Sequence, residues 1–348
     1  MKRAMRRLLT LVICGSEICA DSTECTPPCW RALFEANWDL GFGCRQDTLR
    51  FVDSYKTQPL LGGNTLIRAN DHQKWNGLNI VELEGFLSLA YKNFYVRGLA
   101  DYGWIVGGEN PATDSQTIMG GGITEALATY TSGRTQGYVW DGSGGVGYQL
   151  HWDRVHLMAT PLIGYSYHKQ KTNQPSIRGF SNQDIISVTS STYSDTGNRK
   201  AIYKWYGPWV GLDLAYYPTC AFKIFGTYEF HWGWSSLFGK ANVSLIQTSP
   251  PTTPPLTASV VAYRTYNDDR STGNDASLGF SYKFCHWTVG LLGNYKYWKV
   301  NRGSNVNKYE TLSIEPEPVI GKGSAEKINW QSWSLLATIG FDFILKKK

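Results

Sequence analysis

The last stretch of the chain, from Trp330 to Leu345, alternates between apolar residues and residues that are mostly small or polar. A period of two places alternate side chains on opposite faces of a β-strand. A strand of a soluble sandwich would usually be about half this length. The pattern therefore predicts the closing strand of a transmembrane barrel, with aromatic residues at the lipid–water interfaces. Its apolar positions are Trp333, Leu335, Ala337, Ile339, Phe341 and Phe343.

The same alternation recurs along the chain, and ten strands emerge. Their connections alternate strictly between short turns and long polar segments, an arrangement typical of bacterial outer-membrane barrels. We therefore predict an all-β protein, a ten-stranded antiparallel transmembrane β-barrel with both termini in the periplasm and five long extracellular loops. The short turns fall at 92–93, 151–154, 218–221 and 285–286, and the predicted loops at 44–79, 108–135, 169–201, 237–274 and 300–329.

The N-terminus predicts export. Residues 1–20 combine a basic start, a short apolar core from Leu8 to Cys14, and a plausible cleavage site at Ala20. We interpret them as a signal peptide and residues 21–348 as one barrel domain of the bacterial outer membrane. After the signal peptide no run of 18 apolar residues occurs, which excludes a helical membrane protein.

The inward face would have to carry any transport or catalytic function. In a barrel of about ten strands the lumen is only slightly wider than its side chains can fill. Buried charges must pair or meet water, so we expect a polar core that holds the wall in shape. A narrow channel is the alternative, and its surplus of acids would favour cations. The predicted lumen charges are Glu35, Asp39, Glu82, Glu84, Arg97, Asp101, Asp141, Asp213, Lys223, Glu229, His231, Lys283, Lys296 and Asp342.

The barrel architecture resembles that of the omptins, which are ten-stranded outer-membrane proteases. The resemblance implies an Asp-x-Asp pair on one side of the mouth and Asp-x-His on the other, to activate a water. Here Glu229 and His231 offer a local match, but the segment Gly107 to Asn110 lacks the acidic pair, and Glu229 lies well inside its strand. We interpret His231 as an interior residue with satisfied hydrogen bonds and predict no enzymatic activity. An omptin-like protease is the second alternative.

Other motifs are absent from the sequence. The glycines of 120–122 and 142–147 precede no helical pattern, so they form no phosphate loop, and in the fourth strand they permit bending or close approach of the wall. Histidine and cysteine show no metal-ligand spacing. The formal charge of +6 comes without a basic stripe, so nucleic acid is not expected as a partner. We predict no cofactor and no metal.

Five cysteines remain after removal of the signal peptide, and four of them are predicted at the periplasmic end. Thiols in an oxidising compartment are normally paired, and an odd number leaves one for another molecule. The aromatic, glycine-rich sequence with its cysteines resembles chlamydial outer-membrane proteins, particularly those of Protochlamydia. The candidates for cross-links are Cys25, Cys29, Cys220 and Cys285.

The sequence thus predicts an outer-membrane barrel with a structural or surface-interaction role. The expected partners are outer-membrane lipid, the barrel-assembly machinery and, through disulfides, other envelope proteins.

Overall fold

A computed structural model describes residues 32–57, 66–109, 111–119, 123–132, 135–184, 191–219, 221–248, 256–300, 303–311 and 319–346. The predicted signal peptide and three of the candidate cysteines, Cys25, Cys29 and Cys220, lie outside these residues. Within them, no helix is long and apolar enough to cross a membrane.

The described chain is almost entirely β-strand, with one short 3₁₀ helix at Asp153–Val155. The strands are β1 (Ala32–Thr57), β2 (Leu66–Tyr91), β3 (Phe94–Glu109), β4 (Pro111–Met119), β5 (Ile123–Ser132), β6 (Gln136–Tyr148), β7 (Leu150–Trp152), β8 (Leu157–Asp184), β9 (Ser191–Tyr216), β10 (Phe222–Thr248), β11 (Leu256–Phe284), β12 (Trp287–Val300), β13 (Gly303–Thr311) and β14 (Val319–Lys346).

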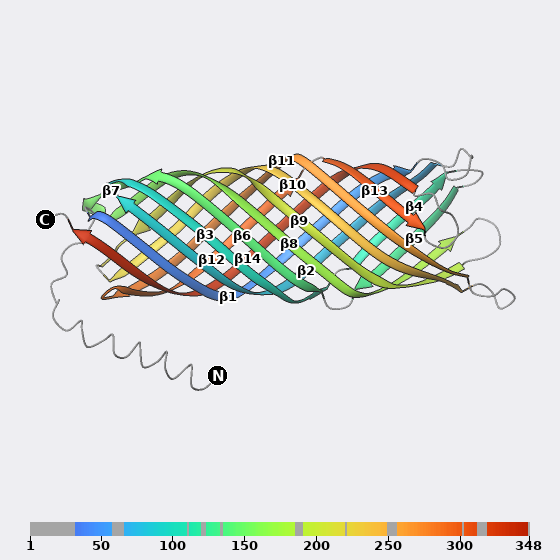
Figure 1. Cartoon of the computed structure of the whole chain (residues 1–348), viewed down its shortest axis with the longest axis horizontal. Coiled ribbons are helices and arrows are strands. Elements are labelled where there is room, and N and C mark those ends of the chain that lie inside the picture. Colours follow the sequence, from blue (N-terminus) through green and yellow to red (C-terminus); the bar gives the residue numbers. More distant parts are fainter. Residues whose placement is uncertain are drawn as a thin grey trace, which may run out of the picture.

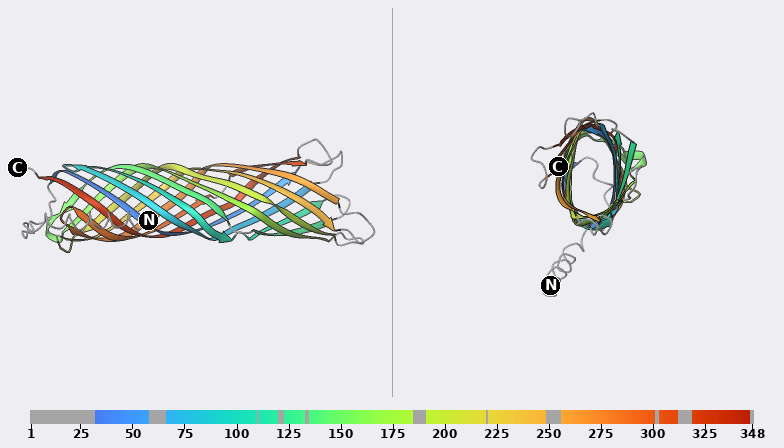
Figure 2. Two further views of the ribbon diagram at one scale, coloured as in Figure 1. Left: turned by 60° about the horizontal axis from the view of Figure 1, so that its bottom comes forward. Right: turned by 90° about the vertical axis from the view of Figure 1, so that its right-hand side faces the viewer.

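These strands form one closed antiparallel barrel (Figure 1). Its wall has ten staves, where a stave is one continuous strand or a row of shorter strands that continue one another. Three staves are interrupted: β4 continues β3, β5 precedes β6 and β7, and β13 continues β12, because the parts pair with the same neighbours. The barrel closes where β1 pairs with β14, with Trp38 opposite Phe341. Viewed from one end it is a complete oval ring (Figure 2). The predicted ten-stranded barrel is therefore confirmed.

The strands are much longer than a membrane requires. β2, β8 and β11 have 26, 28 and 29 residues, whereas a tilted strand crosses a bilayer with about 9–11. The five segments predicted as long loops are therefore mostly wall. In the predicted loop 237–274, for example, β10 continues to Thr248 and β11 begins at Leu256. The prediction of a loop was wrong there. Polar composition was taken as a sign of irregular structure, but a strand whose outer face is in contact with water is also rich in polar residues.

Large apolar side chains face outward along the half of the barrel that ends in the short turns. We call this half the turn end and the opposite half the far end. An outward apolar belt with aromatic residues at its margins matches the lipid-facing surface of a membrane barrel. Members of the belt include Trp38, Phe42, Leu87, Tyr91, Phe94, Trp104, Trp140, Ile163, Tyr165, Leu212, Tyr228, Trp234, Phe280, Trp287, Leu291, Leu335 and Phe343.

Toward the far end the polarity of the two faces reverses. Arg50 and Lys74 lie opposite each other on β1 and β2 and are exposed on the outside. Their neighbours Leu49 and Trp75, also opposite each other, are buried inside the barrel. This is the apolar-in, polar-out pattern of a sheet with water on its outer face. The wall therefore continues beyond the lipid as a water-exposed barrel with its own core.

The two faces of β12 give a direct test of the in-and-out register. Leu291 is exposed within the apolar belt, whereas Asn294 donates a hydrogen bond to Glu84 inside the lumen (3.4 Å). Leu291→Arg is expected to lower the free energy of unfolding by about 2–4 kcal/mol, as a charge does at the bilayer midplane. Asn294→Arg should cost less, because the position borders a cavity. Urea unfolding in lipid vesicles measures both, and equal costs would contradict the register.

Candidate functional site

The lumen is divided along its length into a cavity at the turn end, two clusters of charged residues and an apolar core toward the far end. The cavity has a volume of about 620 Å³ and is lined by residues of the short turns, among them Lys92, His151 and Cys285. The predicted charges Glu35, Asp39, Lys223, Lys283 and Asp342 line it. Lys283 binds Asp342 through a 2.7 Å ion pair.

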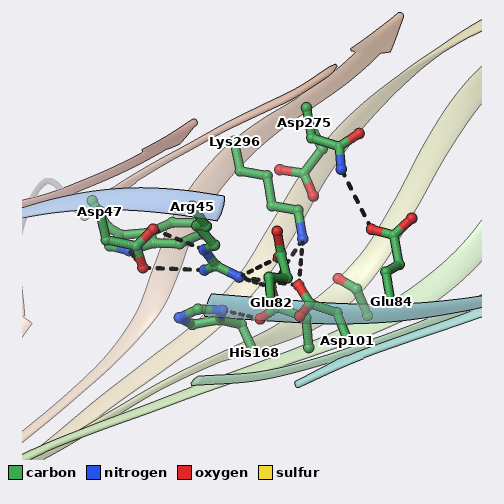
Figure 3. Close-up of polar contacts among 12 residues, drawn as sticks. Arg45, Asp47, Glu82, Glu84, Asp101, His168, Asp275 and Lys296 are labelled. Carbon is green, nitrogen blue, oxygen red and sulfur yellow. Dashed lines mark hydrogen bonds and ion pairs between the residues drawn. The ribbon is translucent and has the colours of Figure 1, made fainter. Parts of the chain in front are cut away.

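The first charged cluster is built around Arg45 (Figure 3). The Arg45 guanidinium contacts four carboxylates, and its side chain is 1% exposed. Lys296 supplies a second cation and lies 2.9 Å from Asp141. We call these residues the Arg45 cluster; they come from five staves and meet inside the lumen. The Arg45 contacts are Asp47 at 2.8 Å, Asp141 at 2.8 Å, Asp101 at 3.1 Å and Glu82 at 3.2 Å.

The Arg45 cluster is tied to aromatic residues on its far side. Trp330 donates a hydrogen bond from Nε1 to Asp47 (3.2 Å), and its ring lies 5.2 Å from the Arg45 guanidinium carbon. His168 is bound through Nδ1 to Asp141, and its ring lies 4.4 Å from that of Trp330. Arg45 is therefore enclosed by carboxylates and by an aromatic ring, whereas Asp141 and Lys296 also border the cavity.

The second charged cluster lies between Arg97 and His231. Arg97 pairs with Asp213 (3.3 Å) and with Glu229. His231 is fully buried. Its Nε2 lies 3.1 Å from Glu229 and 3.4 Å from Asp275, and its Nδ1, on the other side of the ring, is hydrogen-bonded to Ser166 (2.9 Å). We call these residues the Arg97 cluster. Glu229 and Asp275 border the cavity, so this cluster forms part of its wall.

Glycine in the fourth and fifth staves makes room for an indole inside the lumen. Trp209 lies against Gly145 and Gly164, which are paired across β6 and β8. A Cβ added to Gly164 would lie 2.3 Å from Trp209 Cζ2, and one added to Gly145 would lie 2.5 Å from Cη2. Close approach across the wall therefore accounts for these two glycines. The Arg97 guanidinium carbon lies over the ring of the same indole, 5.0 Å from its centroid.

An apolar core fills the lumen beyond the Arg45 cluster. Aromatic rings cross it, with Trp75 against Tyr203 (5.7 Å between ring centroids) and Trp205 against Trp330 (5.9 Å). Charges cannot cross such a layer without losing their hydration. The lumen core consists of Leu49, Phe51, Trp75, Leu78, Ile80, Ile105, Val139, Ala201, Tyr203, Trp205, Leu237, Trp298, Val300, Ile328 and Trp330.

Sequence reasoning missed the organising members of this site. Arg45 and Asp47 were assigned to a loop, as were the core residues Leu49, Phe51 and Trp75. A signal was present, because Arg45 and Asp47 continue the inward series of Asn37 and Asp39 at the same period of two. His168 and Asp275 lie just outside the predicted loops 169–201 and 237–274, and neither was among the predicted lumen charges.

The cysteines are only partly described. Cys44 is a free thiol on the outer face of β1. Cys285 is disulfide-bonded, and its partner lies outside the described residues. Cys25, Cys29 and Cys220 also lie outside them, so the disulfide to a second envelope protein stays a prediction.

Comparisons with known proteins agree with this architecture. A family model described as Protochlamydia outer membrane protein matches residues 39–343. The crystal structure of the outer-membrane protease OmpT from Escherichia coli aligns with a TM-score of 0.54 at 14% identity, covering 92% of this chain and 100% of that one. A FadL homologue from Pseudomonas aeruginosa aligns at a TM-score of 0.23 and 12% identity, covering 88% and 90%. No curated protein matches. At 14% identity the likeness to OmpT concerns the fold alone.

Proposed function

The chain belongs to the Protochlamydia outer membrane protein family, and from this membership and its lumen we propose that it is a closed, non-conducting outer-membrane barrel with a structural or surface-interaction role. The observation that carries the proposal is the apolar core that fills the lumen beyond the Arg45 cluster. With the turn end in the periplasm, as in other outer-membrane barrels, this core lies on the extracellular side.

The alternative of a cation-preferring channel finds less support. An ion entering from the periplasm would meet the Arg45 cluster, whose carboxylates already bind Arg45 and Lys296. Beyond them it would have to pass Trp205, Trp298 and Trp330, which are at most 3% exposed. The paired charges therefore support a role in holding the wall together rather than in conduction.

We also propose that the protein is not an enzyme. A protease of the omptin type would need its histidine where a peptide bond can reach it. His231 is 0% exposed and lies between β8, β10 and β11 inside the barrel. Peptides offered at the cell surface would be separated from it by the lumen core.

The surface role is supported by the wall that rises above the apolar belt. At the margin of the belt Lys169 and Lys204 lie directly opposite each other on β8 and β9. Their chain neighbours His168 and Trp205 are buried inside, so the two ammonium groups are on the outer face. Like charges directly opposite destabilise a sheet, and anionic lipid head groups at this level would relieve the repulsion. Further out, the wall is available to other partners at the cell surface.

Labelling of intact cells tests this orientation. Lys200, on the far part of β9, is exposed, and Lys92 is exposed in the turn between β2 and β3. Lys200→Cys is expected to gain labelling by a membrane-impermeant maleimide over the wild type, because the residue stands on the cell surface. Lys92→Cys, the matched control, should gain it only after the outer membrane is permeabilised. The opposite result would show an inverted barrel and would exclude a surface role for the projecting wall.

A further inference from the structure

Three potential metal ligands meet at the wall of the cavity. Glu229 and His231 share the inward face of β10, and Asp275 on β11 is the direct cross-strand partner of Glu229. Their ligand atoms all lie within 4.8 Å of one another. His231 Nε2 is 3.1 Å from Glu229 Oε2 and 3.4 Å from Asp275 Oδ2. Ligands about 2.0–2.2 Å from a tetrahedral metal ion are about 3.3–3.5 Å apart. The two distances from His231 Nε2 are close to that spacing, and the two carboxylates lie within 4.8 Å of each other.

The hydrogen bonds of the site leave room for an ion. His231 Nδ1 is hydrogen-bonded to Ser166, which directs Nε2 toward the two carboxylates. Although Nε2 is buried, no described residue gives it a hydrogen bond of proper geometry, and Asp275 Oδ1 is likewise without one. A hydrogen bond that orients the second ring nitrogen is the usual environment of a histidine that binds a metal.

The net charge of the site is negative, which favours the binding of a cation. Asp213, Glu229 and Asp275 are three carboxylates, and Arg97 is the cation that pairs with two of them. With neutral His231 the group carries two negative charges, and Glu229 and Asp275 are directly opposite each other. Lys296 is the direct cross-strand partner of Asp275 on β12, but its ammonium group is bonded to Asp141 in the Arg45 cluster. A divalent ion would balance the charge and remove the repulsion between the two strands.

We propose that Glu229, His231 and Asp275 bind one divalent transition-metal ion of the zinc class, with water from the cavity completing its coordination. One imidazole and two carboxylates are ligands that zinc accepts, and a set of three protein ligands leaves a position open. The cavity reaches from Glu229 and Asp275 to the turn residues Lys92 and Cys285, which provides an entry path from the periplasm. The site is independent of the sealed lumen and goes beyond the proposed function.

Zinc titration of the folded barrel tests the site. The mature chain is prepared without a histidine tag, its free thiols are blocked with iodoacetamide, and Zn²⁺ binding is followed by calorimetry in detergent. The wild type should bind one equivalent. Asp275→Asn should raise the Kd at least about 10-fold, and Ser166→Ala, which frees the His231 ring, about 10- to 100-fold. Asp342→Asn, which removes a lumen carboxylate outside the site, should leave the Kd unchanged.

Two results would overturn the proposal: no stoichiometric binding by the folded wild type, or equal affinities of Asp275→Asn and Asp342→Asn. Heat-modifiable mobility in electrophoresis establishes whether each variant is folded. If Asp275→Asn fails to fold, the visible spectrum of Co²⁺ bound to the wild type decides. Intense bands of a four- or five-coordinate ion would support the site, and the weak absorption of the hexa-aqua ion would contradict it.

Discussion

Replacing Arg45 with methionine is expected to lower the free energy of unfolding by about 3–5 kcal/mol, the typical cost of removing one partner from a buried ion cluster. Arg45 contacts four carboxylates that are themselves buried, and Asp47 and Glu82 are at most 1% exposed. Methionine would retain the length of the side chain but leave these carboxylates facing one another with Lys296 as the main remaining cation. Urea unfolding in lipid vesicles, followed by tryptophan fluorescence, measures the loss.

Lys283→Met is the matched control for Arg45→Met. Lys283 is also a cation in the lumen and pairs with Asp342, but the two side chains are 29% and 18% exposed at the turn end. Water screens this pair, so its loss should cost about 1 kcal/mol or less. Equal losses for the two variants would show that the Arg45 cluster does not organise the lumen.

Trp330→Ala is expected to lower the free energy of unfolding by about 3–5 kcal/mol, the range for truncating a buried tryptophan. Trp330 is fully buried where the apolar core meets the Arg45 cluster, packs on Trp205 and donates a hydrogen bond to Asp47. Alanine would leave a cavity and an unpaired acceptor at the same point. The same unfolding experiment reports the change.

Trp333→Ala provides the comparison on the same strand. Trp333 lies three residues further along β14 and is 57% exposed on the lipid-facing side. Lipid chains can fill the space that its indole leaves, so its truncation should cost clearly less than that of Trp330. A larger loss at Trp333 than at Trp330 would contradict the assignment of the two faces of β14.

The wall of the barrel was predictable because membrane burial imposes one simple rule on its strands. Apolar residues outside and polar residues inside give a period of two, as in the series from Trp333 to Phe343. The same rule places Glu82, Asp101 and Asp141 in the lumen, and the structure has them there.

The apolar core and the pairing of charges could not be predicted in the same way. Beyond the lipid the rule reverses, so Leu49 and Phe51 point inward while Arg50 points outward. A prediction that looks only for outward apolar residues therefore assigns such a segment to a polar loop. Contacts across the lumen depend on the tilt and stagger of the strands. Arg45 therefore meets Asp141, 96 residues away, although no spacing in the sequence indicates it.

Ion conductance in planar bilayers tests most directly whether the lumen is sealed. The folded barrel is inserted into bilayers, with a porin added in a parallel experiment to show that open channels are detected. The barrel is delivered to the bilayers from lipid vesicles, and recovery of the heat-modifiable form from these vesicles shows that it is folded. The core formed by Trp75, Trp205 and Trp330 predicts a flat baseline across the applied voltages. Discrete, cation-selective steps from the wild-type protein would contradict a sealed lumen.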